Sequence, residues 1–192
     1  MLPLILASSS PYRRKLLQRL RLSFQHQNPN IDESPKTDES ANELVLRLAG
    51  EKAEAIARDN PKALIIASDQ VAVLGEEILT KPGTPEKALK QLSACNGKSV
   101  LFLTSLCLLN SHTQQKHSLV EPFTVHFRQL EQTQLKRYIQ TEQPLDCAGS
   151  FKMEGLGISL FERFEGGDPN SLVGLPLIQL VNLLRLEGIT IP

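Results

Sequence analysis

The stretch LILASSSPYRRKLL, residues 4–17, decides the fold of this chain. Its apolar beginning, Leu4–Ser8, is typical of a buried strand. Ser10 then predicts a helix N-cap and Pro11 the first helical residue, because a proline at this position lacks only an N–H that has no partner within a helix. Leucines follow at helical spacing up to about Leu20. The sequence therefore predicts a strand that leads directly into a helix.

Strand and helix patterns alternate outward from this stretch. The next strand is expected near Leu22–Gln27, and the polar loop NPNIDESPKTDES follows it. The capping box of Ser40 and Glu43 predicts a second helix, ELVLRLAGEKAEAIA. Further helices are expected from Thr84-Pro85 to a point before Gly97, near Gln132–Glu142, and in PLIQLVNLLRLEG.

The remaining apolar regions are β-rich. ALIIASDQVAVLGEEIL predicts a buried strand, a polar break at residues 68–70, and a second strand with a hairpin at Gly75. KSVLFLTSLCLLN and HSLVEPFTVHFR, separated by a polar turn, predict an antiparallel pair. Together with the alternation at the start, this pair predicts an α/β protein with a mixed sheet and flanking helices. Because no repeat and no clean linker occurs, we expect a single domain over residues 1–192.

Composition excludes several classes of partner. The chain has 192 residues, of which 41% are hydrophobic, so it can bury a substantial core. Lys and Arg number 21 and Asp and Glu also 21, so no general attraction for nucleic acid or an anionic membrane is expected. The apolar run near the N-terminus is too short for a signal peptide, and no later run approaches a membrane-spanning length. We therefore expect a cytoplasmic protein whose anion recognition is local.

The cysteines and histidines predict neither a disulfide framework nor a zinc site. Cys95, Cys107 and Cys147 are odd in number and widely spaced, so we interpret them as structural thiols. The four histidines lack the spacing of a metal site.

The junction between the first strand and the first helix has the features of an anion site. Backbone N–H groups and the positive end of the helix dipole point at such a position. Ser8 and Ser10 can donate to phosphate oxygens, and Arg13 can add a bidentate clamp. The alternative is that Ser10 only caps the helix while Arg13 is solvated, and the spacing alone leaves both open. No Walker motif, G-x-G-x-x-G motif or G-x-S-x-G nucleophile elbow occurs.

Acidic and basic residues elsewhere could complete such a site. Asp69 follows a buried strand, where ligands bind in open α/β sheets, and Asp32-Glu33 lies in the polar loop. Carboxylates in these positions can hold a divalent cation or accept a proton from water, although Asp32-Glu33 also fits a solvated turn. Lys52 and Lys81, taken singly, also fit ordinary surface lysines.

Taken in order, several short motifs resemble the Maf nucleotide pyrophosphatase family. They are LASSSPYRRKLL, Asp32-Glu33, EKA at 51–53, SDQ at 68–70, Lys81-Pro82, CAGSF at 147–151 and VGLPL at 173–177. The resemblance implies a mixed α/β fold with two lobes around a cleft, similar to the inosine triphosphate pyrophosphatases (Maf/Ham1-like), and commonly a homodimer. It also implies hydrolysis of a nucleoside triphosphate to the monophosphate and pyrophosphate with a divalent cation, Mg²⁺ or Mn²⁺.

The resemblance assigns roles to individual residues. Asp69 matches the catalytic base, and Glu33 together with Asp69 matches the metal site. The phosphate-binding positions are matched by Ser8, Ser10, Arg13, Lys52 and Lys81.

Three further residues point to a subgroup. Tyr12, Gln70 and Glu154 resemble the members that act on 7-methylguanosine triphosphate, whereas members that prefer pyrimidine triphosphates typically have Asp-Thr in place of Asp69-Gln70. Some members carry Trp where this chain has Tyr12, which keeps an aromatic face. N7-methylated guanine is cationic, so an aromatic face and a carboxylate both attract it. The alternatives are a pyrophosphatase for pyrimidine or other non-standard triphosphates, and a nucleotide-binding regulator of cell division and septum formation.

Overall fold

A computed structural model describes residues 2–191 of the chain. The chain divides into two compact units. The first contains the residues up to Asp69, Thr104–Glu121 and the residues from Asp168 onward; the second contains Gln70–Leu103 and Pro122–Gly167. Among residues 2–191, no helix has the length and apolar character that crossing a membrane requires.

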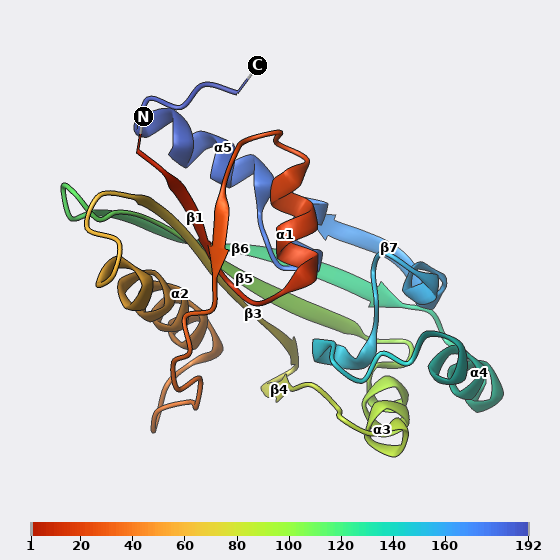
Figure 1. Ribbon diagram of the computed structural model, residues 1–192. Coiled ribbons are helices and arrows are strands. Elements are labelled where there is room, and N and C mark those ends of the chain that lie inside the picture. The colour runs from red at the N-terminus through yellow and green to blue at the C-terminus, as the bar shows by residue number, and fades with distance from the viewer. Residues whose placement is uncertain (1, 192) are drawn as a thin grey trace. The chain divides into compact units, whose positions relative to one another are not determined.

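The secondary structure is a mixed sheet with helices (Figure 1). The strands are β1 (Leu4–Ala7), β2 (Gln25–Gln27), β3 (Leu64–Leu74), β4 (Glu77–Leu79), β5 (Ser99–Asn110), β6 (Gln115–Phe127) and β7 (Phe161–Gly166). The helices are α1 (Pro11–Gln18), α2 (Ala41–Ala57), α3 (Pro85–Cys95), α4 (Gln132–Glu142) and α5 (Leu177–Leu186), with short 3₁₀ helices η1 (Ala148–Ser150), η2 (Leu156–Leu160) and η3 (Pro169–Val173). The strand order is β2-β1-β3-β5-β6-β7, and β4 pairs with β3. Because β1 runs parallel to β2 and β3 while β4 and β7 pair antiparallel, the predicted α/β class with a mixed sheet is confirmed.

In the first unit, side chains of successive strand residues point to opposite faces of the sheet, so each strand supplies two cores. One face packs against α1 and α5 through Leu4, Leu6, Leu64, Ile66, Leu106 and Leu108. The opposite face packs against α2 through Ile5, Ala7, Ile65, Ala67, Cys107 and Leu109. Thus α1, which carries Arg13, and α2, which carries Lys52, cover opposite faces of the same strands.

The second unit has an aromatic core. Phe151 and Phe161 lie 4.8 Å apart at 86°, and Phe127 and Phe161 lie 4.9 Å apart at 84°, which are edge-to-face arrangements. Phe102, Phe123 and Phe164 extend this cluster. Beside it, α3 packs against α4 and η1.

The structure corrects one expectation at the centre of the chain. The predicted break at residues 68–70 is wrong, because β3 continues without interruption from Leu64 to Leu74. The polar residues remain in the strand because each has a partner: the Ser68 hydroxyl donates to the Gly174 carbonyl, and the Asp69 N–H donates to Ser105 Oγ. Asp69 therefore lies within a strand and not after its end.

Smaller differences concern boundaries. α1 ends at Gln18 and β2 begins at Gln25, so both elements are shorter than expected. The glycine-punctuated segment 147–167 contains a strand, β7, that its sequence pattern did not predict.

Candidate active site

The serine-rich turn between β1 and α1 is ordered by its own hydroxyls. Ser10 Oγ accepts a hydrogen bond of 3.3 Å from the backbone N–H of Arg13, so the predicted N-cap is confirmed. Ser8 Oγ accepts one of 3.1 Å from the N–H of Ser10. A hydroxyl that accepts such a bond retains its O–H as a donor, so both serines can still donate to an anion at the start of the helix.

Arg13 is held in place by the backbone of a distant segment. Its Nε donates to the carbonyl of Gly174 at 2.7 Å, and the Ser68 hydroxyl donates to the same oxygen at 2.8 Å. Burial lowers the pKa of Arg13, while the carboxylates of Asp69 and Glu33 act in the opposite direction. A guanidinium remains protonated under these conditions, so Arg13 is a positive charge that two carboxylates, Asp69 and Glu33, attract electrostatically.

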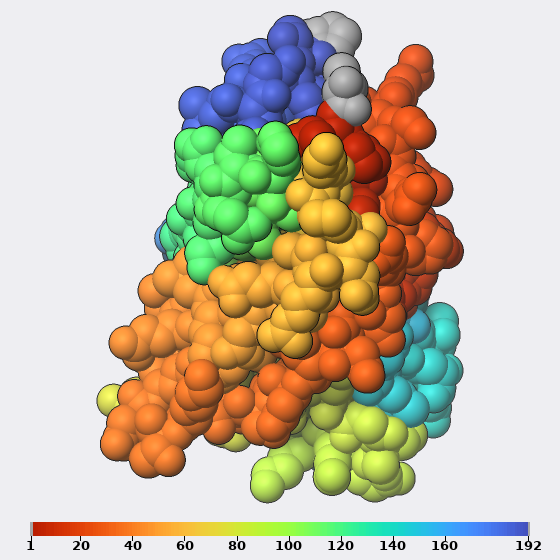
Figure 2. All heavy atoms as spheres, turned by 60° about the vertical axis from the view of Figure 1, so that its left-hand side comes forward, coloured from red at the N-terminus to blue at the C-terminus, as the bar shows by residue number. Residues whose placement is uncertain are grey.

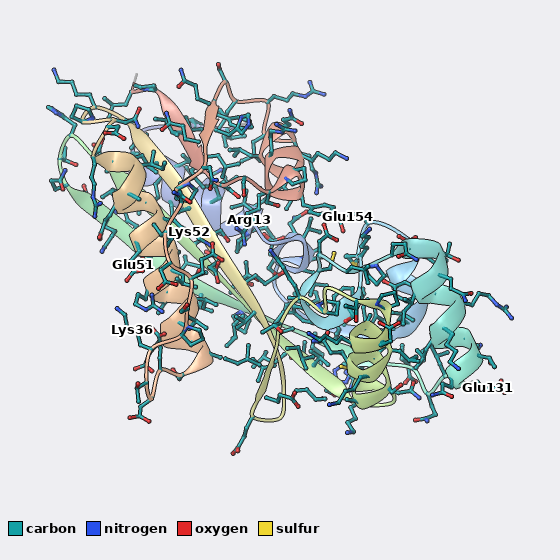
Figure 3. The ribbon with its side chains drawn as sticks, turned by 60° about the horizontal axis from the view of Figure 1, so that its bottom comes forward. Arg13, Lys36, Glu51, Lys52, Glu131 and Glu154 are labelled. Atoms are coloured by element: carbon teal, nitrogen blue, oxygen red, sulfur yellow. The ribbon has the colours of Figure 1, made fainter. Side chains whose placement is uncertain are left out.

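Lys52 lies between those two carboxylates. Its Nζ is 2.6 Å from Asp69 Oδ1 and 2.7 Å from Glu33 Oε1, and its side chain is only 5% exposed. The surface-lysine interpretation is therefore wrong for this residue. Figure 3 shows Lys52 on α2 and Arg13 on α1.

Asp69 and Glu33 reach Lys52 from different kinds of structure. Asp69 is buried in β3, and Ser105 fixes its backbone by accepting from the Asp69 N–H at 3.0 Å while donating to the Val45 carbonyl at 2.6 Å. Glu33 comes from the polar loop and its side chain is 57% exposed. One carboxylate is thus rigid and the other is carried by a loop.

Two converging carboxylates fit a hard divalent cation. Mg²⁺ is usually bound through one or two carboxylates together with substrate phosphates and waters. One carboxylate oxygen of Glu33 and one of Asp69 converge on the same atom, Lys52 Nζ. Within residues 2–191 no group of three or more His, Cys, Asp and Glu side chains could hold a metal, so phosphate or water would have to complete the ligands of a cation bound at these two carboxylates.

Comparison with known proteins places this chain in a family. A family model described as "Maf-like protein" matches residues 3–187. The chain belongs to the Maf family. It is 60% identical over 189 residues to a protein of Pseudomonas aeruginosa named "7-methyl-GTP pyrophosphatase", covering 98% of each chain. A protein of Alcanivorax borkumensis with the same name is 58% identical over 189 residues, covering 98% of this chain and 96% of its own.

Solved structures show the same fold. The Ham1 protein of Staphylococcus aureus superposes with a TM-score of 0.54 at 15% identity, covering 97% of this chain and 98% of its own. A Ham1 protein from Coxiella burnetii has a TM-score of 0.51 at 14% identity, covering 97% of this chain and 100% of its own. The expected likeness to that fold is confirmed.

The other predicted residues of this Maf protein are divided between its two units. Gln70 follows Asp69 in β3 and is partly buried, whereas Lys81 and Glu154 are exposed. Tyr12, in the first turn of α1, belongs to the first unit and is partly buried. The roles assigned to these four residues stay predictions.

Sequence reasoning missed two residues that organise the site. Gly174 has φ = 101°, and a Cβ there would lie 3.1 Å from Arg13 Nε. Ser105 joins β3 and α2 through hydrogen bonds to their backbones. Gly174 lies in the VGLPL motif, yet nothing in that motif indicates which side chain its carbonyl would meet.

The cysteines lie in surroundings that favour the neutral thiol. Burial raises the pKa of Cys95 to about 11 and that of Cys147 to about 12, and it also raises the pKa of Cys107. All three are free thiols. Since the thiolate is the reactive form, these pKa values fit the structural role predicted for them.

Proposed function

We propose that this Maf protein hydrolyses 7-methyl-GTP to 7-methyl-GMP and pyrophosphate. The observation that carries the proposal is the cluster of Lys52, Asp69 and Glu33, whose carboxylates interact electrostatically with Arg13 of the serine-capped helix α1. This arrangement combines positively charged side chains, which can bind phosphates, with a carboxylate that can accept a proton. Identity of about 60% over nearly the whole chain to proteins named for that activity supports the same reaction.

Each residue of the site has its own role in the proposed reaction. Ser8, Ser10 and Arg13 bind phosphate oxygens, and Asp69 accepts the proton of the water that attacks the α-phosphorus. Pyrophosphate then leaves, and the positive charges of Lys52 and Lys81 stabilise the negative charge on the phosphates. A divalent cation, Mg²⁺ or Mn²⁺, bound by Glu33 and Asp69 would supply further charge neutralisation.

Base selection is assigned to Tyr12, Gln70 and Glu154. The methylated guanine ring carries a positive charge, which the face of Tyr12 attracts through a cation–π interaction. A carboxylate such as Glu154 attracts the same charge and can accept hydrogen bonds from the N1 and N2 edge of guanine, which pyrimidines do not offer.

A triphosphate panel tests the proposal. We expect pyrophosphate release with Mg²⁺ or Mn²⁺ and its loss on chelation, with kcat/KM higher for 7-methyl-GTP than for GTP, dTTP, UTP or CTP. A preference for a pyrimidine triphosphate would favour the alternative substrate class. Tight nucleotide binding without turnover would favour a regulator of cell division.

Variants then separate the reaction from base preference. Tyr12→Ala is expected to reduce the ratio of kcat/KM for methylated over plain GTP by roughly two- to thirty-fold, because a cation–π contact contributes about 0.5–2 kcal/mol. Tyr12→Phe keeps the aromatic face and is the matched control. Glu154→Gln should also lower the ratio of kcat/KM for methylated over plain GTP. If neither Tyr12→Ala nor Glu154→Gln changes the ratio, the base assignment fails while the pyrophosphatase assignment can stand.

The proposal also includes a cytoplasmic location, a homodimer, and no nucleic-acid partner. The equal numbers of acidic and basic residues support the last of these. Fractionation of cells tests the location, and light scattering of the purified protein tests the homodimer.

A further inference from the structure

The loop that carries Glu33, residues 28–40 between β2 and α2, makes several contacts with one arginine of α2, Arg47. Arg47 Nε lies 2.5 Å from Glu39 Oε1, and Arg47 Nη2 lies 2.7 Å from Glu39 Oε2. This is the bidentate geometry in which a guanidinium binds a carboxylate most strongly. Both side chains are largely buried, at 16% and 8% exposed. Figure 2 shows the loop and α2, both in orange, as one continuous surface.

The same guanidinium also reaches the backbone next to Glu33. Arg47 Nη2 donates to the carbonyl of Ser34 at 3.1 Å, and Nη1 donates to Glu51 Oε2 at 3.0 Å. Arg47 therefore joins the residue that follows Glu33, the end of the loop, and the next turn of the helix. A lysine cannot replace it, because an ammonium lacks the planar fork that reaches these partners together.

The backbone around Glu33 is fixed on its other side as well. Asp32 Oδ1 accepts a hydrogen bond of 2.9 Å from the Ser34 N–H, which closes a turn with Glu33 at its centre. Glu39 Oε2, while bound to Arg47, accepts one of 3.0 Å from the Lys36 N–H. These bonds leave the Glu33 side chain directed at Lys52, whose Nζ lies 2.7 Å from Glu33 Oε1.

We propose that Arg47 is a positioning residue of the pyrophosphatase site, which holds the loop 28–40 so that Glu33 stays beside Lys52 and Asp69. The Glu33 side chain is 57% exposed, so solvent screens its ion pair with the buried Lys52, and the order of the loop needs further contacts. Arg47 supplies that order from outside the site. The inference rests on the proposed function for the role of Glu33.

A double-mutant cycle with Glu33 tests this role. Arg47→Met removes the guanidinium but keeps much of the apolar part of the side chain. We expect it to lower kcat/KM about ten- to hundred-fold, because the loss of a residue that orients a ligand-binding side chain commonly has an effect of that size. In a Glu33→Gln background the same change should cost almost nothing, because the residue being positioned is already disabled.

Lys36→Met is the matched control. Like Arg47→Met it removes one positive charge, here from the loop 28–40 itself, and with it an exposed ion pair between Lys36 and Glu51 at 3.5 Å. We expect it to leave kcat/KM unchanged, which separates positioning from loss of charge.

Amide hydrogen exchange reports the loop directly. Exchange of residues 33–38 should become faster in Arg47→Met and stay as in the wild type in Lys36→Met, while the helical amides of α2 remain protected in both. If the wild type is active, three results would overturn the positioning role. Arg47→Met could keep its activity, it could keep the protection of the loop amides, or it could lower kcat/KM by the same factor in the Glu33→Gln background as in the wild type. A wild type that does not hydrolyse 7-methyl-GTP overturns the proposed function instead.

Discussion

Among single residues, Lys52 shows most clearly how burial and charge combine in this site. An ammonium that is only 5% exposed has lost most of its water, so it needs negative partners, and it has Asp69 and Glu33. Removal of one partner from a buried pair costs about 3–5 kcal/mol, because the other charge is left uncompensated. The second carboxylate protects Lys52 from that penalty when one of the two is substituted.

Asp69→Asn is therefore expected to remove activity but not the fold. The amide keeps the shape and can still accept from Lys52, while Glu33 remains as the counter-charge. The amide cannot accept the proton of the attacking water, so kcat should fall by about 10²–10⁴. Pyrophosphate release measures the loss, and far-UV circular dichroism checks the fold. A folded Asp69→Asn protein with near-normal kcat would show that another group is the base.

Gly174→Ala tests whether the carbonyl of Gly174 orients Arg13. The new Cβ would lie 3.1 Å from Arg13 Nε, and φ = 101° strains any L residue there. We expect kcat/KM to fall about ten- to hundred-fold, because small misplacements of a positioned group have effects of that size.

Gly188→Ala is the control for that prediction. It has a comparable positive φ of 73°, and no heavy atom lies within 4 Å of its Cβ position. Both variants should lose stability through backbone strain, measured by urea unfolding, but only Gly174→Ala should lose activity. Equal kinetics in the two variants would show that Arg13 does not depend on Gly174.

Among the elements, the loop 28–40 makes stability depend on acid pH. The hydrogen bond from Arg47 lowers the pKa of Glu39 from 4.5 to about 2. A carboxylate whose pKa is lower in the folded state stabilises the protein above pH 4.5, and this contribution disappears as the pH falls towards 2. The charges of Arg47 and Lys36 also lower the pKa of Glu39, and the charge of Glu39 in turn raises the pKa of Glu43.

Glu39→Gln isolates this contribution. Urea unfolding from pH 3 to pH 7 should show the wild type more stable at neutral pH and the difference shrinking below about pH 4.5. Because the charge of Glu39 raises the pKa of Glu43, the measured difference contains the effect of Glu39 together with a smaller one from Glu43. A difference that is constant with pH would contradict the role of the ion pair.

Element starts could be predicted because their signals are local. Ser10, Ser40 and Thr84 each accept from a backbone N–H three residues later, so the cap and its partner lie within one turn of sequence. The continuity of β3 could not be predicted, because it depends on Gly174 and Ser105, far away in the chain. For the same reason the sequence indicated Lys52 as a candidate but not its burial.

For the whole molecule, the two units supply their own spectroscopic probes. The chain has two tyrosines and no tryptophan; Tyr12 lies in the first unit and Tyr138 in the second. In Tyr138→Phe only Tyr12 is fluorescent, and in Tyr12→Phe only Tyr138 is. We expect each variant to unfold in urea with the same midpoint by fluorescence and by far-UV circular dichroism, because β3, β5 and β6 each contribute residues to both units. Midpoints that differ within one variant would show that the units unfold separately.

The bond between Arg13 and the Gly174 carbonyl spans 161 positions of the chain, and this separation bears on synthesis. At about 5–20 residues per second, a ribosome adds Gly174 roughly 8–32 seconds after Arg13. During that interval the nascent chain already contains the serines, Arg13, Lys52 and Asp69, but the carbonyl that fixes the guanidinium has not been made. A ribosome-bound chain therefore gains its oriented arginine only after Gly174 has left the exit tunnel, and the emergence of that residue becomes the step that completes the site.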